Sequence, residues 1–403
     1  MKQAYDARLH HYFRKIVSEL PYNQRVQLKN LELCGKRTIP AVGGKSGVFV
    51  LRNSSNATAI FGNMTCKNTW ACPHCTATMM KKYATKISAA IDALREQGQA
   101  AFMLTLTIPH LKKQSCREVT DILYESWRDF FANAWKKKSK NYTVVNRFIK
   151  ECGVTHYVRV AEYTYGGNGW HPHFHCLFWV PKQNLQKVAD YEELLWQRWD
   201  TAFRRQYDKY ASISHEIFRS DDRQSFNILQ ENGKVVECLT SDYICGWGAD
   251  KELTGNIQKK ASHSGHFTPY QMLEFAADGN ENMKDLYIEF ALQVTRRPVH
   301  HRVNFDKRGL CKIAADYMNT KGFKEVIAKK KDSTWKVVCF FTSEQWYDLC
   351  DLDKHSPIIS NILYLIHIHK EELLEEFLES FGIELVKSVH VHTPVVEDIF
   401  NVA

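Results

Sequence analysis

The segment Gly169–Val180 constrains the fold of this chain more than any other part of its sequence. Its residues, Gly-Trp-His-Pro-His-Phe-His-Cys-Leu-Phe-Trp-Val, predict a β-strand because hydrophobic, aromatic and β-branched side chains dominate it. Side chains two residues apart lie on the same face of a strand, so His173 and His175 project together. The segment therefore predicts a sheet that carries a pair of imidazoles on one face.

A partner strand is expected immediately before this segment, at about 154–163. The two strands are separated by turn residues, Tyr165-Gly166-Gly167-Asn168-Gly169. In a hairpin with this centre, Glu162 falls almost opposite His173, and cross-strand neighbours lie about 4.5–5.5 Å apart. A carboxylate would then join His173 and His175 in a mixed nitrogen and oxygen site, which suits Mn²⁺ or Mg²⁺, although Zn²⁺ or Co²⁺ can also bind.

The alternative is a strand that simply carries two histidines. The same spacing recurs at His367-Ile368-His369 and at His390-Val391-His392, where no matching acid or turn accompanies it. For these two later pairs we expect structural or surface roles. The setting of the first pair, between a matching acid and a later tyrosine segment, favours a metal site there.

The remaining hydrophobic patterns mix strands with helices along the chain. We expect helices at 1–30, 76–97, 116–136 and 185–207, and strand character at 47–62 and at 102–108, which Pro109 ends. The tail, 266–403, is expected to be mainly helical with one strand at 335–342. This order predicts an α+β protein with a sheet domain flanked by two smaller parts.

Length and charge set further bounds. A chain of 403 residues fits two or three domains at roughly 100–200 residues each. Its net charge of +9 is compatible with a polyanionic partner. We expect no membrane association and a cytoplasmic location, because no run of roughly 20 apolar residues and no apolar leader occur.

A cysteine cluster lies in the first quarter of the sequence. Cys72-Pro73-His74-Cys75 is a C-x-x-C knuckle, and Cys66 and Cys34 precede it. Four thiolates can hold tetrahedral Zn²⁺, so we predict a structural zinc site. The disulfide and redox alternatives fit a cytoplasmic chain without a preceding thioredoxin-like strand less well. The other eight cysteines are scattered, and we expect them to be reduced and mostly buried.

A tyrosine segment follows at 235–250. Tyr243 can serve as a covalent nucleophile, provided that its hydroxyl, with an ordinary pKa near 10, receives help at neutral pH. A divalent ion on the scissile phosphate would supply part of that help. Among the eighteen tyrosines of the chain, the others are expected to be packing residues.

Taken in order, these pieces resemble the HUH endonuclease superfamily, and most closely the single-tyrosine rolling-circle replication initiators of plasmids and phages. The resemblance covers about 30–310. Its motifs are Leu104-Thr105-Leu106-Thr107, His171-Pro172-His173-Phe174-His175 and Tyr243-Ile244-x-x-Trp247-Gly248, with the cysteine knuckle upstream and Glu252-Leu253-Thr254, Lys259-Lys260 and Thr268–Leu273 downstream.

The resemblance implies a ferredoxin-like antiparallel sheet, origin nicking, and transfer of a 5′ DNA end to Tyr243. It implies three parts: an N-terminal zinc domain over 1–98, a nuclease domain over 99–265 and a mainly helical domain over 266–403. The expected substrate is single-stranded or hairpin origin DNA, and the expected partners are a host replication helicase and polymerase. The setting would be a bacterial cell that carries a plasmid, phage or other mobile element.

The sequence departs from the family pattern at two places. Gly246 stands where members usually have a lysine, a role that Lys251, Lys259 or Lys260 could take over. Leu239 stands where some members place the glutamate that activates water at termination. The nearby acids are Glu237 and Asp242, and neither is assigned; His171 is a further auxiliary candidate.

A basic run at Lys136, Lys137 and Lys138 is our candidate for DNA binding, although a charge run is more often a solvated face. Three other functions stay open. A transposase or relaxase of the same superfamily would share the chemistry. A zinc-dependent DNA-binding regulator would bind without catalysis. A histidine-based metal oxygenase fits the tyrosine motif and the basic charge poorly.

Overall fold

The computed structural model describes residues 7–28, 30–39, 47–53, 58–68, 70–132, 143–210, 225–239, 265–295, 309–320, 336–353 and 358–384. The chain forms two compact units. One is continuous, Ala77–Lys321, and the other combines the two ends of the chain, Met1–Thr76 and Gly322–Ala403. None of the helices in these described segments is long and apolar enough to cross a membrane.

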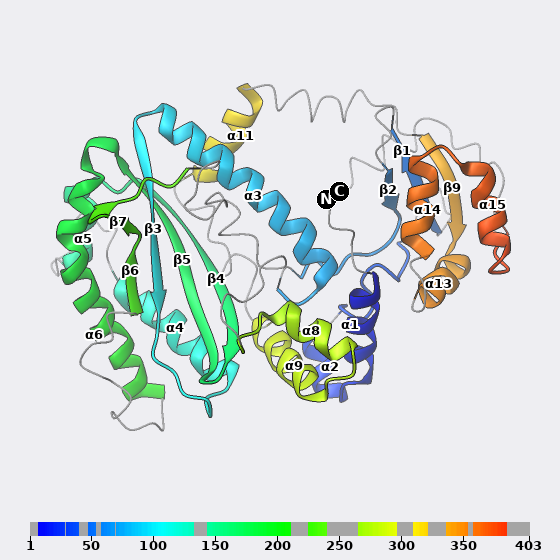
Figure 1. Cartoon of the computed structure of the whole chain (residues 1–403), viewed down its shortest axis with the longest axis horizontal. Helices are drawn as coiled ribbons and strands as arrows, with labels where there is room; N and C mark the ends of the chain where they lie inside the picture. Colours follow the sequence, from blue (N-terminus) through cyan, green and yellow to red (C-terminus); the bar gives the residue numbers. More distant parts are fainter. Residues whose placement is uncertain are drawn as a thin grey trace. The chain divides into compact units, whose positions relative to one another are not determined.

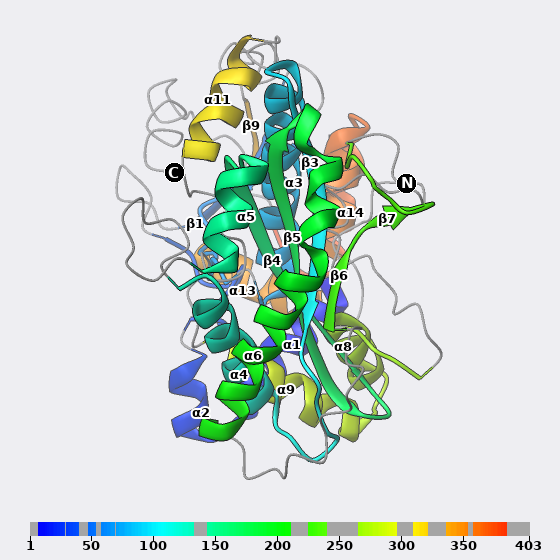
Figure 2. The same cartoon turned by 90° about the vertical axis from the view of Figure 1, so that its left-hand side faces the viewer.

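The continuous unit is built on a four-stranded antiparallel sheet (Figure 2). Its strand order is β4-β5-β3-β6, with bounds β3 (Gln99–Thr107), β4 (His156–Gly166), β5 (Gly169–Pro181) and β6 (Phe226–Ile228). A small separate ribbon pairs β7 (Gln230–Glu231) with β8 (Lys234–Val235).

Strands β4 and β5 form the long hairpin that the turn residues predict. Gly166 pairs with Gly169, so the turn consists of Gly167 and Asn168. Gly169 has a φ of +90°, and a Cβ at this position would lie 2.8 Å from Cα of Lys112. Only glycine fits there without strain, which fixes both the turn and the register of the hairpin.

Helices cover both faces of this sheet. On one face lie α3 (Pro73–Glu96) and α11 (Leu310–Thr320). Their apolar side chains join those of the sheet in one core that includes Ile87, Ile91, Leu94, Met103, Val158, Leu177, Trp179, Leu310 and Ala314. This face also carries His173 and His175, because it bears the odd-numbered residues of β5.

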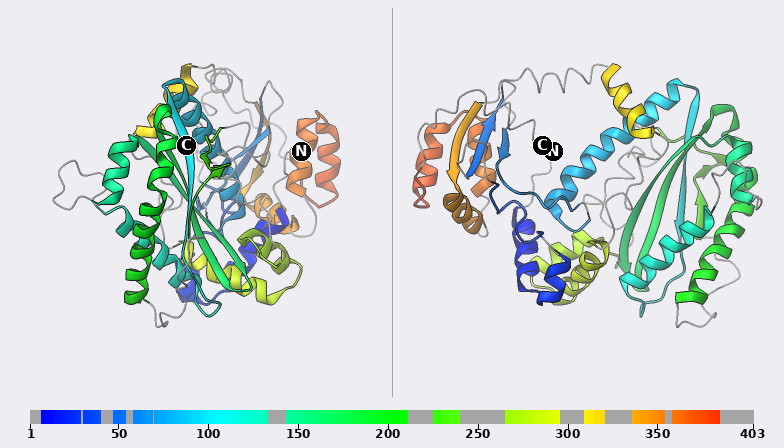
Figure 3. Two further views of the ribbon diagram at one scale, coloured as in Figure 1. Left: turned by 60° about the vertical axis from the view of Figure 1, so that its left-hand side comes forward. Right: turned by 180° about the vertical axis from the view of Figure 1, so that it is seen from behind.

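The opposite face packs against α4 (Cys116–Phe130), α5 (Val144–Cys152) and α6 (Glu192–Tyr210), which follows two short 3₁₀ helices at Lys182–Asn184 and Gln186–Tyr191. The right-hand view of Figure 3 shows α4 and α6 side by side on this face. Helices α8 (Pro269–Ala277) and α9 (Glu281–Thr295) complete the unit, and Phe290 of α9 stacks on Trp170 of β5.

Local capping signals set several of these helix ends. Ser115 accepts a hydrogen bond from the backbone N–H of Glu118 and begins α4. Thr143 and Thr268 each form a capping box, which begins α5 and α8. Gly153 ends α5 in the left-handed conformation.

The second unit joins the two ends of the chain through a three-stranded antiparallel sheet of order β2-β1-β9 (Figure 1). Its strands are β1 (Gly47–Arg52), β2 (Thr58–Phe61) and β9 (Lys336–Thr342), and its helices are α1 (Ala7–Glu19), α2 (Tyr22–Gln27), α13 (Ser343–Leu352), α14 (Ile358–His367) and α15 (Glu371–Glu379). Buried side chains from β1, β9 and the last three helices form one core, including Val48, Val50, Phe341, Trp346, Leu349, Ile362 and Leu378.

The structure confirms the α+β class with antiparallel sheets, and it groups the chain differently from the three segments expected from the sequence. The strand expected at 335–342 is present as β9, but it pairs with β1 near the other end of the chain. The helical character expected at 1–30 is present in the described residues 7–28 as α1 and α2, with Pro21 as the N-cap residue of α2. Helix α5 and strand β6 were not anticipated.

Candidate metal centres

Glu162, His173 and His175 converge on one face of the sheet. Oε2 of Glu162 lies 3.0 Å from Nε2 of His175 and 3.5 Å from Nε2 of His173. The two Nε2 atoms are 3.1 Å apart. All three side chains are largely shielded from solvent, with 8%, 14% and 13% of their surfaces exposed.

The backbone register explains this convergence. Glu162 on β4 is the direct cross-strand partner of His173 on β5, as the turn position predicts. His175 follows on the same face, opposite Val160. The three groups are thus positioned by regular strands instead of loops, which holds them in a fixed geometry.

These residues fit a divalent cation. Ligands about 2.1 Å from an ion and at right angles to one another lie about 3.0 Å apart, close to the spacing found here. The three potential ligand atoms all lie within 4.8 Å of one another. A carboxylate with two imidazoles suits Mn²⁺, Mg²⁺ or Zn²⁺.

Strand β3 lies on the other side of β5 and touches the site through Thr105. Its Oγ1 is 3.2 Å from Nδ1 of His175, the ring nitrogen that faces away from Glu162. The sequence motif containing Thr105 and Thr107 predicted a buried strand, and it gave no sign of this hydrogen bond. The bond depends on the register of β3 against β5, in which Thr105 pairs with His175.

A second pair of imidazoles lies next to His173 and His175. The ring of His171 is centred 5.3 Å from that of His173, and its Nδ1 lies 2.8 Å from Nε2 of His110. Nδ1 of His110 lies 3.0 Å from the carbonyl oxygen of Asn168. A carbonyl only accepts, so Nδ1 of His110 carries the proton, Nε2 of His110 is the acceptor, and Nδ1–H of His171 is the donor.

Both histidines of this pair favour the neutral form. Burial, followed by the charges of His173 and His110, lowers the pKa of His171 from 6.5 to about 3. Burial also lowers the pKa of His110. His171 was an auxiliary candidate from the sequence, whereas His110 was missed because its only signal was a position just after a strand.

Of the auxiliary acids, Glu237 lies away from the histidines. Its carboxylate is 3.2 Å from Nζ of Lys182, just beyond the last residue of β5. The part of β5 that separates His175 from the Lys182–Glu237 ion pair is roughly 20 Å long. Tyr243, Asp242, Lys251 and the run Lys136, Lys137 and Lys138 lie outside the described residues.

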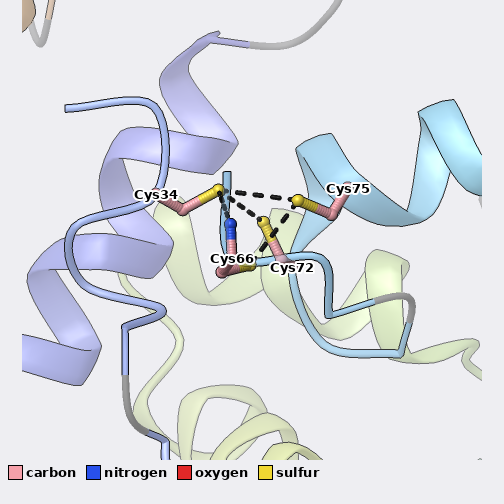
Figure 4. A group of neighbouring side chains, drawn as sticks. All are labelled: Cys34, Cys66, Cys72 and Cys75. Carbon is pink, nitrogen blue, oxygen red and sulfur yellow. Dashed lines mark hydrogen bonds between the residues drawn. The ribbon is translucent and has the colours of Figure 1, made fainter. Parts of the chain in front are cut away.

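The four clustered cysteines, Cys34, Cys66, Cys72 and Cys75, also come together (Figure 4). Sγ of Cys34 lies 3.6 Å from Sγ of Cys75 and 3.6 Å from Sγ of Cys72, and Cys66 lies 3.5 Å from Cys75. Four sulfurs about 2.3 Å from a tetrahedral Zn²⁺ would be about 3.8 Å apart, so the cluster fits zinc closely.

The surroundings of the cysteines support a closed structural site. Backbone N–H groups of Cys66 and Asn68 donate to Sγ of Cys34 and Cys66 at 3.3 and 3.4 Å. Burial raises the pKa of the Cys72 thiol, whereas thiol hydrogen bonds, first from Cys34, lower the pKa of Cys75. A bound cation would stabilise all four as thiolates.

Two histidines, His10 and His74, lie beside the cysteine cluster. Nε2 of His10, on α1, lies 3.7 Å from Sγ of Cys72, and its ring stacks on His74 at 5.3 Å. The ring of His74 thus packs against His10, and His74 is not one of the four clustered residues, as its place inside the tight knuckle predicts. His10 was missed by the sequence interpretation because it precedes the cluster by a long stretch of chain.

Comparison with known proteins shows similarity to replication proteins over part of the chain. Residues 57–215 match the family model described as replication protein. A protein named "Protein rep" from Streptomyces lividans is 28% identical in an alignment of 257 residues that covers 57% of this chain and 56% of that protein. A "Neomycin resistance protein" from Streptomyces cyanogenus is 25% identical over 154 residues, 34% of this chain and 35% of that protein.

The matched segments span about half and about a third of these two relatives, and no solved structure matches the chain. The family match begins just before β2, includes Cys66, Cys72 and Cys75, and runs through the strands that hold Glu162, His173 and His175. These findings confirm the resemblance drawn from the motifs, because residues 57–215 of the chain are similar to the replication protein family.

Proposed function

We propose that this protein initiates rolling-circle replication by nicking single-stranded or hairpin origin DNA with Tyr243, as an HUH endonuclease with a ferredoxin-like sheet. The proposal rests chiefly on one observation. Glu162, His173 and His175 converge on one face of an antiparallel sheet, within a segment that matches replication proteins. The order of the three sequence motifs is the reason for choosing Tyr243 as the nucleophile.

In this proposal Glu162, His173 and His175 hold Mg²⁺ or Mn²⁺. The ion would supply electrostatic stabilisation of the charge that develops on the scissile phosphate. The residues of the chain supply the rest. The two strands of the hairpin orient the ligands, and the helices that cover the sheet keep the site largely dry, which strengthens every charge interaction there.

Tyr243 is the proposed nucleophile. Its hydroxyl gives up its proton as the oxygen attacks phosphorus, the bond from phosphorus to the 3′ oxygen breaks, and the 3′ oxygen takes up a proton. The products are a 5′-phosphotyrosine and a free 3′-OH that can prime synthesis. Because one phosphodiester replaces another, the bond energy is retained, and the reverse transfer can rejoin strands.

Auxiliary roles remain for residues around the tyrosine. Asp242, which adjoins Tyr243 in the sequence, is a candidate for activating water at termination, whereas Glu237 forms an ion pair with Lys182 just beyond the last residue of β5. Lys251 is a candidate for the charge that Gly246 does not supply. His171, held by His110 beside the metal ligands, is a candidate hydrogen-bonding group for the DNA or its hydration.

The cysteine cluster is proposed to bind structural Zn²⁺, and Lys136, Lys137 and Lys138 to contact the DNA backbone. A host replication helicase and polymerase would act on the nicked strand. The proposed setting is the cytoplasm of a bacterial cell that carries a plasmid, phage or other mobile element. A transposase or relaxase would share this chemistry and would act on element ends instead of a replication origin.

A nicking assay tests the proposal. The full chain, with Mn²⁺, would be incubated with labelled single-stranded hairpin DNA that contains its own origin, and the products separated on a denaturing gel. We expect a slow protein–DNA band for the wild type that Tyr243→Phe and Glu162→Gln abolish. Tyr364→Phe, at an exposed tyrosine on α14, is the matched control and should retain the band. Binding of origin DNA without any such band would favour the regulator instead.

A further inference from the structure

The two threonines of strand β3 face the two histidines of strand β5. Thr105 is the direct cross-strand partner of His175, and Thr107 is that of His173. Directly opposite residues in an antiparallel pair project to the same face with Cβ atoms about 4.5–5.5 Å apart. Both hydroxyls are therefore on the face that carries Glu162.

Only one of these two pairs is closed by a hydrogen bond in the structure. Oγ1 of Thr105 lies 3.2 Å from Nδ1 of His175. Among the described residues, by contrast, neither Oγ1 of Thr107 nor Nδ1 of His173 has a hydrogen-bond partner, although both atoms are buried. Buried polar atoms are nearly always paired, so two unpaired atoms on facing residues point to a missing bond between them.

We infer that Thr107 is the positioning residue of His173, through a hydrogen bond from Oγ1 of Thr107 to Nδ1 of His173, as Thr105 is of His175. Staggered positions about χ1 are about 120° apart, so one rotation moves the Thr107 hydroxyl while the backbone stays in place. The inference rests on the proposed metal site, because the threonine hydroxyls would orient the imidazoles that bind the cation.

The chemistry of imidazole explains why the site needs these hydroxyls. Both histidines turn Nε2 toward Glu162, so Nε2 is the atom that offers a lone pair to a cation. A neutral imidazole then carries its proton on Nδ1, and this proton needs an acceptor. A threonine hydroxyl supplies one, and it also fixes the orientation of the ring.

A hydroxyl suits the site without metal as well. When Nε2–H of the histidine donates to Glu162, Nδ1 becomes the acceptor and the hydroxyl becomes the donor. Threonine serves both arrangements, whereas valine, of nearly the same shape, serves neither. The alternation Leu-Thr-Leu-Thr in β3 thus places leucines 104 and 106 toward the helices of one face and both hydroxyls toward the metal ligands.

The test measures Mn²⁺ affinity of the full-length protein by electron paramagnetic resonance. We expect Thr107→Val and Thr105→Val each to weaken binding about 10- to 100-fold, the usual effect of removing such a partner. Thr107→Ser retains the hydroxyl and should bind close to wild type. Thr155→Val is the matched control, because its hydroxyl lies 3.2 Å from Gln99 at the other end of the sheet. Thermal unfolding of each variant shows whether it is folded.

The outcomes separate this inference from the proposed function. Loss of Mn²⁺ binding in Glu162→Gln, with Thr107→Val equal to Thr155→Val, would overturn the role of Thr107 and leave the metal site standing. If Glu162→Gln binds Mn²⁺ as the wild type does, the proposed site is wrong. The hydrogen bond is then tested by the ¹⁵N chemical shift of Nδ1 of His173 in metal-free protein. Thr107→Val should change this shift, and Thr107→Ser should not. An unshifted signal would overturn the inference.

Discussion

Nδ1 of His171 donates a hydrogen bond of 2.8 Å to Nε2 of His110, whose own Nδ1–H is fixed by the carbonyl of Asn168. The turn of the hairpin therefore determines the tautomer of His171, two residues before His173. Strand register and turn geometry, which define the hairpin, also set the protonation pattern beside the proposed metal site.

The first prediction concerns pH. The pKa of His171 falls from 6.5 to about 3 on folding, so the unfolded chain binds the extra proton between these values. Stability should decrease as pH falls below 6.5, by about 2 kcal/mol at pH 5 from this residue. Urea unfolding of metal-free protein at pH 7 and pH 5 measures the loss. His171→Asn, which keeps a donor toward His110, should lose correspondingly less between the two values.

The control for the pH prediction is His367→Asn, at an exposed position on α14. It should show the same pH dependence as the wild type. An equal loss of stability in His171→Asn and in the wild type would contradict the assignment.

The second prediction concerns zinc. Removing Zn²⁺ by chelation, or by Cys72→Ser, should unfold the segments around the cysteine cluster, because a closed tetrathiolate site contributes directly to folding. Hydrogen exchange should show lost protection at 30–39 and 58–68 and retained protection in β4 and β5. Binding of Mn²⁺ at Glu162 should survive in part.

Metal analysis gives the companion measurement for zinc. The wild type and Cys311→Ser, at a cysteine outside the cluster, should each contain one zinc per chain. Unchanged protection at 30–39 after complete removal of zinc would rule out a structural role.

The third prediction concerns DNA binding. Changing Lys136, Lys137 and Lys138 to glutamate should weaken binding of single-stranded DNA in a salt-dependent way. Each lost phosphate contact lowers the slope of log affinity against log salt by about 0.7, so the slope should fall by about 2. Fluorescence anisotropy across a salt series measures it. The same slope in variant and wild type would show that these three lysines do not contact the DNA backbone.

The fourth prediction concerns Glu289 on α9. One carboxylate oxygen accepts from the backbone N–H of Cys116 at 2.6 Å, and the other from Nε1 of Trp170 at 2.9 Å. Glu289→Ala leaves both buried donors unpaired and should lower the free energy of unfolding by about 2–6 kcal/mol, at roughly 1–3 kcal/mol for each donor. Chemical denaturation checks the value. Glu274→Ala, at an exposed position on α8, should change it little.

The central hairpin and the convergence of Glu162, His173 and His175 could be predicted because their signals are local. The alternation around His173 and His175 sets the face, and the glycines of the turn set the register, so Glu162 falls opposite His173 as expected. The cysteine cluster was predictable for a similar reason, since the C-x-x-C spacing fixes two of its four ligands.

What the sequence could not predict depends on contacts between distant segments. Pairing of β9 with β1 joins opposite ends of the chain, and no local pattern encodes a partner at that separation. The hydrogen bonds of Thr105 and His110 depend on how β3 and its following loop register against β5. Strand β6 is too short to show a period.

The central claim is that Tyr243 becomes joined to a 5′ DNA end, and mass spectrometry of the adduct tests it most directly. Wild-type protein would be incubated with origin DNA and Mn²⁺, digested with nuclease and protease, and the modified peptide sequenced. The account predicts a nucleotide 5′-phosphate on Tyr243 and on no other residue. A nucleotide on a different side chain, or cleavage of the origin without any modified peptide, would contradict it.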